Sequence, residues 1–128
     1  MTESDRTAKK GLLVLCYPKC STCRKALAWL DAHGVAYEKR DIAVEHPTRE
    51  ELSVWMSTSG LPVRRFFNTS GRLYRELGVK VRLDGGVTDD EALDLLATDG
   101  MLVKRPLVVG EGVVLVGFRE AEWERALL

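Results

Sequence analysis

The fold is decided by the stretch LLVLCYPKCSTC, which spans Leu12–Cys23. Its apolar first half predicts a buried strand over residues 11–16, and apolar residues at helical spacing predict a helix over 21–33 that ends at Gly34. The chain returns to an extended pattern over residues 35–42. Two strands joined by a helix form a β-α-β unit, so these strands are predicted to be parallel.

Cys20 and Cys23 lie at the turn between the first strand and the helix. The first turn of a helix presents unpaired N–H groups and the positive end of the helix dipole, and both favour a thiolate, which is the nucleophilic form of cysteine. Lys19, Arg24 and Lys25 add positive charge nearby. The sequence therefore predicts that Cys20 is a readily ionised nucleophile and that mild oxidation joins it to Cys23 in a disulfide.

Two other interpretations of this cysteine pair stay open. A Cys-x-x-Cys pair is also half of a zinc site. The chain offers Cys16, His33 and His46 as further ligands, but none of them forms a second close pair. The two cysteines can also be inert. Cys16 is predicted to behave as a small buried hydrophobe, and the two histidines are predicted to be surface residues.

Length and composition indicate one domain with a single core, since the chain has 128 residues, of which 45% are hydrophobic and 30% charged. The chain has 19 basic and 19 acidic residues, so its net charge is zero and does not favour direct binding of nucleic acid. The apolar runs are too short to span a membrane. Residues 1–10 are expected to be a flexible tail without a signal peptide, which favours the cytoplasm, where stable disulfides are uncommon.

Residues 48–100 are predicted to be mainly helical. Thr48 with Glu51, and Thr88 with Glu91, have the spacing of capping boxes, in which each side chain bonds the other residue's backbone N–H. A short helix is expected around residues 73–77. This block is interpreted as an insertion into a single domain that spans residues 11–128.

Strand patterns return over residues 107–110 and 113–117, separated by a Gly-containing turn that predicts an antiparallel hairpin. A terminal helix is expected over 119–128. Without the helical block, the order β-α-β, β-β-α is that of an α/β fold with a thioredoxin-like, glutaredoxin-type mixed four-stranded sheet. Pro106 precedes the hairpin, and this topology favours a cis peptide bond there, beside the cysteines.

Several motifs together resemble the glutaredoxin-dependent arsenate reductases of the ArsC type and the related Spx-type redox regulators. The resemblance covers roughly residues 11–127. It is carried by the segments Tyr17–Ala26, Gly60–Arg64, Val103–Val109 and Gly117–Arg119.

The resemblance implies a set of site residues. In the reductases, a cysteine that matches Cys20 attacks the arsenic centre of the substrate. Three arginines bind the oxyanion, and they match Arg64, Arg105 and Arg119, although Arg65 could replace the first. Guanidinium groups suit this task because their fork of donors matches an oxyanion. No bound cofactor is implied, and glutathione with glutaredoxin, or thioredoxin, would be the external reductant.

Two positions depart from the reductase pattern. Tyr17 stands where those enzymes usually have asparagine, and Cys23 stands where they usually have serine. A second cysteine at this spacing allows an internal disulfide, as in Spx-type regulators, which bind RNA polymerase. Those regulators carry a basic C-terminal extension, and we expect no counterpart of it after Leu128.

The favoured function is a thiol-dependent oxidoreductase of the arsenate reductase family. It would act on a small oxyanion or a disulfide, and Cys23 or an external thiol would resolve the intermediate. The alternative is an Spx-like regulator that binds the RNA polymerase α subunit. A monomer without membrane association is expected in either case.

Overall fold

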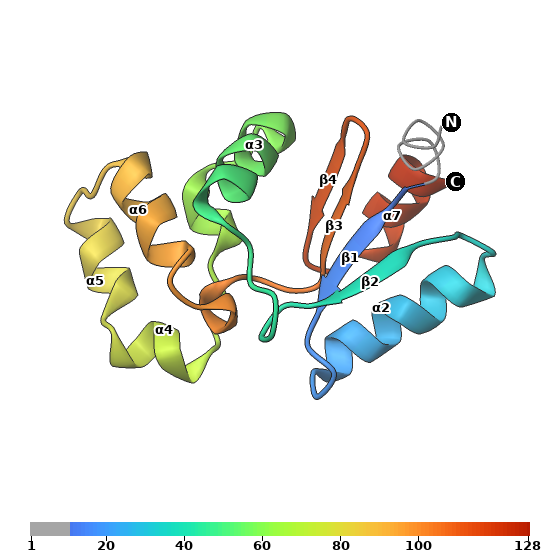
Figure 1. Ribbon diagram of the computed structural model, residues 1–128, viewed down its shortest axis with the longest axis horizontal. Helices are drawn as coiled ribbons and strands as arrows, with labels where there is room; N and C mark the ends of the chain where they lie inside the picture. Colours follow the sequence, from blue (N-terminus) through green and yellow to red (C-terminus); the bar gives the residue numbers. More distant parts are fainter. Residues whose placement is uncertain (1–10) are drawn as a thin grey trace. The chain divides into compact units, whose positions relative to one another are not determined.

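The computed structural model describes residues 11–128, and one of its two units contains a mixed four-stranded sheet (Figure 1). The strand order is β2-β1-β3-β4, with β1 and β2 parallel and the other pairs antiparallel. The strands are β1 (Leu13–Cys16), β2 (Glu38–Asp41), β3 (Leu107–Gly110) and β4 (Val113–Val116). The predicted mixed sheet, its parallel pair and its hairpin are therefore confirmed.

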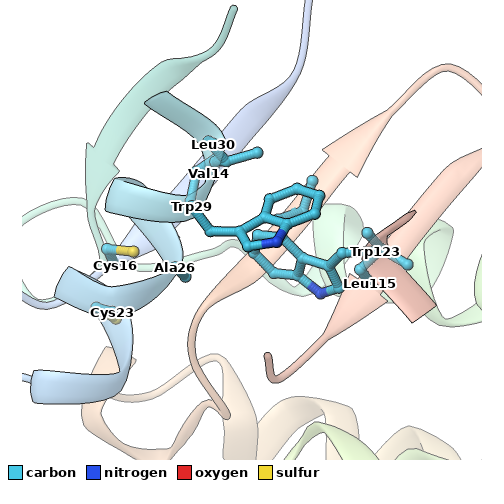
Figure 2. Close-up of a cluster of buried hydrophobic side chains, with 9 residues drawn as sticks. Val14, Cys16, Cys23, Ala26, Trp29, Leu30, Leu115 and Trp123 are labelled. Carbon is cyan, nitrogen blue, oxygen red and sulfur yellow. The ribbon is translucent and has the colours of Figure 1, made fainter. Parts of the chain in front are cut away.

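Two helices, α2 (Ser21–Ala32) and α7 (Glu120–Leu127), pack on one face of this sheet. That face is formed by Val14, Val108 and Leu115, which lie side by side in the strand register. Trp29 of α2 and the fully buried Trp123 of α7 meet edge to face above it, with ring centroids 5.8 Å apart (Figure 2). The two tryptophans therefore join both helices to the sheet through one apolar core.

Strand β2 begins later than the sequence suggests. Gly34 adopts a left-handed conformation with φ of 68° after α2, and the N–H of Val35 donates to the carbonyl of Leu30 at 3.0 Å. These contacts close the end of the helix as in a Schellman motif. Val35 and Tyr37 pack against the apolar core before the strand starts at Glu38.

The second unit comprises Ile42–Lys104 and is mainly helical. Both predicted capping boxes are present, at Thr48 and at Thr88. The single short helix expected around residues 73–77 is followed by a second one after Gly78, whose φ is 61°. The elements are α3 (Arg49–Ser59), η1 (Val63–Phe66), α4 (Arg72–Glu76), α5 (Val79–Asp84), α6 (Asp89–Leu96) and η2 (Gly100–Leu102).

The chain leaves the sheet-bearing unit after Asp41 and returns to it at Arg105. That the two units make one domain, with residues 48–100 as an insertion, stays a prediction. The tail expected over residues 1–10 lies outside the described residues. Between residues 11 and 128, no helix is long and apolar enough to cross a membrane.

Candidate active site

A tight turn places Cys20 at the start of α2. The N–H of Cys20 donates to the carbonyl of Tyr17 at 2.9 Å, which closes the loop between β1 and the helix. Cys20 is the N-cap residue, half-buried, with an extended backbone and no side-chain capping hydrogen bond. The N–H groups of the first turn, which begins at Ser21, therefore lack a side-chain cap and point toward this end of the helix.

Cys23 lies one turn further on and is only 1% exposed. The backbone N–H of Tyr17 donates to its Sγ at 3.4 Å. A hydrogen bond from the Cys16 thiol is the largest cause that lowers the pKa of Cys23, and the Tyr17 N–H, the Cys20 thiol and the charge of Arg105 act in the same direction. Burial opposes the change but is outweighed. Cys23 is therefore a buried thiol whose surroundings favour the thiolate.

Cys16 ends β1 and is 3% exposed, in the apolar environment that the sequence predicts. Its hydrogen bond to Cys23, together with burial, raises the pKa of the Cys16 thiol, so this group stays protonated as a donor. All three cysteines are free thiols. The contact between Cys16 and Cys23 was not foreseen from the sequence, and the only available signal was the position of Cys16 four residues before Cys20.

Arg105 precedes β3, and the Arg105–Pro106 peptide bond is cis, the form that the sequence analysis favours. The guanidinium carbon lies 5.3 Å from the centre of the Tyr17 ring, in a cation–π contact. Its Nη1 atom is buried and has no hydrogen-bond partner among residues 11–128. Tyr17, which departs from the reductase pattern, thus contacts Arg105 through its ring and Cys23 through its backbone.

Arg119 is the exposed N-cap residue of α7. In the register, Leu107 pairs with both Leu15 and Val116, so β1 ends, β3 begins and β4 ends at the same end of the sheet. The N–H of Gly117 also donates to the carbonyl of Pro106 at 2.9 Å. The topology therefore brings the loops that contain Cys20, Arg105 and Arg119 to one end of the sheet.

Arg64 belongs to the helical unit, in η1, and is half-exposed. Its Nη2 atom forms an ion pair with Asp84 at 2.9 Å, and Asp84 also binds Lys80 at 2.8 Å. The adjacent Arg65 is exposed as well. That Arg64 joins Arg105 and Arg119 over the thiols stays a prediction.

The zinc alternative would need Cys16, His33 or His46 as further ligands, and Cys16 does contact Cys23. No group of three or more His, Cys, Asp or Glu residues within 11–128 is arranged to hold a metal ion. Both histidines are exposed, and their ring nitrogens lie close to backbone carbonyls. Nδ1 of His33 is 2.8 Å from the carbonyl oxygen of Trp29, and Nδ1 of His46 is 3.1 Å from that of Pro47.

The sequence of this chain also matches a known protein family over most of its length. Residues 15–126 match the model of the ArsC family. The chain belongs to the ArsC family. This match covers both the sheet-bearing unit and the helical unit.

Relatives within the ArsC family carry different names. The uncharacterized protein YusI of Bacillus subtilis is 50% identical over 84% of this chain and 91% of its own length. A possible arsenate reductase of known structure from Streptococcus mutans is 45% identical, with a TM-score of 0.82, over 91% of this chain and 98% of that one. The global transcriptional regulator Spx of Streptococcus agalactiae is 28% identical over 82% of this chain and 74% of its own. The predicted family and its thioredoxin-like α/β fold are confirmed, and its members are named both as reductases and as regulators.

The lowered pKa of Cys23 gives this ArsC-family chain a specific pH dependence of stability. The pKa is about 6 in the folded chain, against an ordinary value of 9.0. Since the folded pKa lies below the unfolded one, the stabilisation is complete above about 9.0 and is lost as pH falls through about 6. The free energy of unfolding should therefore rise with pH across this window in the native sequence, relative to Cys23→Ala.

Urea unfolding at a series of pH values measures this rise. Both chains carry the same two histidines, so a histidine contribution common to both cancels in the difference. Cys16→Ala removes the largest cause of the lowered pKa and should make the rise shallower. If the free energy of unfolding changes equally with pH in the native sequence and in Cys23→Ala, the pKa of Cys23 is not lowered by folding.

Proposed function

We propose that this ArsC-family protein is a thiol-dependent oxidoreductase in which Cys20 attacks a small oxyanion, with arsenate as the leading candidate, or a disulfide. Cys20 is suited to this role because it is the half-buried cysteine at the helix start, whereas Cys16 and Cys23 are buried. The uncapped first turn of α2 places N–H groups beside the attacking sulfur. Such donors favour an anionic substrate.

The unpartnered guanidinium nitrogen of Arg105 is the observation that carries this proposal. A buried donor without a partner is costly, so natural proteins seldom keep one unless it serves a purpose. Tyr17 supports the guanidinium through its ring face, and a ring face does not neutralise the positive charge. Nη1 of Arg105 is thus available to an oxyanion, and Arg119, whose loop lies at the same end of the sheet, would supply further donors.

The reaction can be written with atoms and electrons in balance. The Cys20 thiolate attacks the arsenic atom of arsenate, an oxygen leaves as water, and a sulfur–arsenic bond forms. A second thiol then attacks the Cys20 sulfur, and arsenic departs with the electron pair of that bond as arsenite. Two thiols are oxidised to a disulfide while arsenic(V) is reduced to arsenic(III).

Two thiols can perform the second attack. Cys23 is within hydrogen-bonding reach of Cys20 and has a lowered pKa, which suits it to form an internal Cys20–Cys23 disulfide. Glutathione could attack instead, and glutaredoxin or thioredoxin would then restore the thiols. Either reductant is external, and the protein needs no bound cofactor for these steps.

A coupled assay tests the proposal. The purified protein is mixed with arsenate, glutathione, glutaredoxin and glutathione reductase, or with thioredoxin and its reductase, and NADPH consumption is followed. We expect consumption that depends on both arsenate and the protein. A low-molecular-weight disulfide serves as a parallel substrate. Absence of turnover with both substrates and both reductants would overturn the proposal.

The Cys-x-x-Cys pair favours one alternative, an Spx-like redox regulator. A pair that forms an internal disulfide can switch a binding surface without turning over a substrate. In that case the reduced and oxidised forms should differ in binding to purified RNA polymerase α subunit, measured by pull-down. Binding to the α subunit together with an inactive coupled assay would favour the regulator over the reductase.

A further inference from the structure

Cys16 gives this site a third thiol. The amide nitrogen of Tyr17 lies 3.4 Å from Sγ of Cys23 and is separated from Cα of Cys16 by one carbonyl carbon. Sγ of Cys23 is therefore within about 6 Å of that Cα, given standard backbone dimensions. Figure 2 shows the two side chains in the same part of the apolar cluster, one from β1 and one from α2.

Cys16 and Cys23 also line one cavity, of about 450 Å³. Tyr17, Arg24 and Lys39 are among its other walls, whereas Cys20 is not. The cavity gives the two side chains room to change rotamer, which the dense packing of an ordinary core would resist. Cys23 is therefore the central thiol, because it contacts Cys20 on one side and Cys16 on the other.

We propose that Cys16 is a second resolving thiol, which accepts the disulfide from the Cys20–Cys23 pair. In this three-cysteine relay, the disulfide moves from Cys20–Cys23, of which Cys20 is half-buried, to Cys16–Cys23, of which both members are buried. Cys20 is thereby returned to the thiol form while the chain as a whole stays oxidised. The relay extends the proposed function and rests on formation of the Cys20–Cys23 disulfide.

The exchange needs no external oxidant or reductant. Once Cys23 is in a disulfide, its hydrogen bond with Cys16 and its negative charge, which raise the pKa of Cys16, are lost. The Cys16 thiol then releases its proton to water, and its sulfur attacks Sγ of Cys23. A Cys16–Cys23 bond forms, the Cys20–Cys23 bond breaks, and Cys20 leaves as a thiolate that takes up a proton. One disulfide and one thiol are present before and after the step, so atoms and electrons balance.

Trypsin makes the relay measurable, because cleavage after Lys10, Lys19 and Arg24 separates Cys16 from the other two cysteines. The peptide Gly11–Lys19 carries Cys16, and the peptide Cys20–Arg24 carries the pair. A Cys20–Cys23 disulfide stays inside the second peptide, whereas a Cys16–Cys23 disulfide joins the two peptides. The two states therefore differ in mass without reduction.

The full chain is oxidised with one equivalent of diamide, quenched in acid, denatured, and alkylated with N-ethylmaleimide. Monomers are isolated by non-reducing electrophoresis, which removes intermolecular disulfides before digestion. We expect the native sequence to yield both disulfides, with Cys20 alkylated in the joined peptides. The Cys20→Ser variant keeps both buried thiols and should yield the joined peptides as its only disulfide.

Cys16→Ala is the matched control, and it should lose the joined peptides completely while it keeps the Cys20–Cys23 disulfide. After removal of diamide, the Cys20–Cys23 disulfide of the native sequence should decline with time as the joined peptides increase. In Cys16→Ala the Cys20–Cys23 disulfide should not decline. The relay is overturned if monomeric Cys20→Ser leaves Cys16 fully alkylated after oxidation.

The failure of the relay is distinguishable from failure of the proposed function, because this experiment contains no arsenate. Joined peptides without arsenate turnover would support the relay and contradict the reductase. Arsenate turnover without joined peptides would support the reductase and overturn the relay.

Discussion

Replacing Cys20 by serine is expected to reduce arsenate-dependent turnover by about 10³-fold or more, the scale on which loss of a nucleophile acts. The hydroxyl of serine is a far weaker nucleophile than a thiolate, and it cannot form the disulfide that completes the reaction. The coupled assay with glutathione and glutaredoxin measures the loss. Since Cys20 is half-buried and serine is nearly isosteric, the fold should be retained, and the urea midpoint checks this.

Thr22→Ala is the matched control for this variant. Thr22 is exposed and lies between the two cysteines, and its substitution should leave turnover close to that of the native sequence. Cys23→Ser provides the counter-test because Cys23 has the lowered pKa. If Cys23→Ser loses all activity while Cys20→Ser keeps most of it, then Cys23 is the attacking thiol and the proposed assignment is wrong.

Replacing Arg105 by lysine is expected to lower kcat/KM for arsenate by about 10- to 100-fold, the equivalent of one or two lost charge-assisted hydrogen bonds. Lysine keeps the positive charge but lacks the planar fork, and it stacks less well on the Tyr17 ring. A matched control is Arg125→Lys, an exposed position in the last turn of α7.

The Arg105 prediction has a second measurement, which requires no turnover. Arsenate or sulfate bound beside the thiols should slow alkylation of Cys20, and Arg105→Lys should weaken that protection. Equal protection in the native sequence and in Arg105→Lys would show that this guanidinium does not hold the anion.

Local patterns predicted much of the fold. The two capping boxes were recognisable because Thr48 with Glu51, and Thr88 with Glu91, act within a single helical turn. The cysteine turn and the hairpin were likewise specified by neighbouring residues. The late start of β2 was harder to predict. The residues that precede it include Val35 and Tyr37, whose β-branched and aromatic side chains suit a strand, but the N–H of Val35 closes the end of the helix by bonding to Leu30.

The candidate site was less predictable, since its main contacts join residues through their three-dimensional positions. Nothing in the sequence says that the Cys16 side chain faces Cys23, or that the Tyr17 ring lies against Arg105, which is far along the chain. The resemblance to the family predicted that Cys20, Arg105 and Arg119 are site residues. Their arrangement depends on the strand register, which only the folded sheet displays.

The sheet-bearing unit, which contains the three thiols, is assembled from both ends of the chain, and this has a consequence during biosynthesis. Arg105 follows Cys23 by about 80 residues, so at roughly 5–20 residues per second a ribosome adds it about 4 to 16 seconds later. During that interval β1 lacks its β3 neighbour, and Cys23 lacks the nearby charge of Arg105. An oxidant present at that moment meets Cys16 and Cys23, which the finished protein buries, so these two thiols are chemically more vulnerable in the nascent chain than in the mature one.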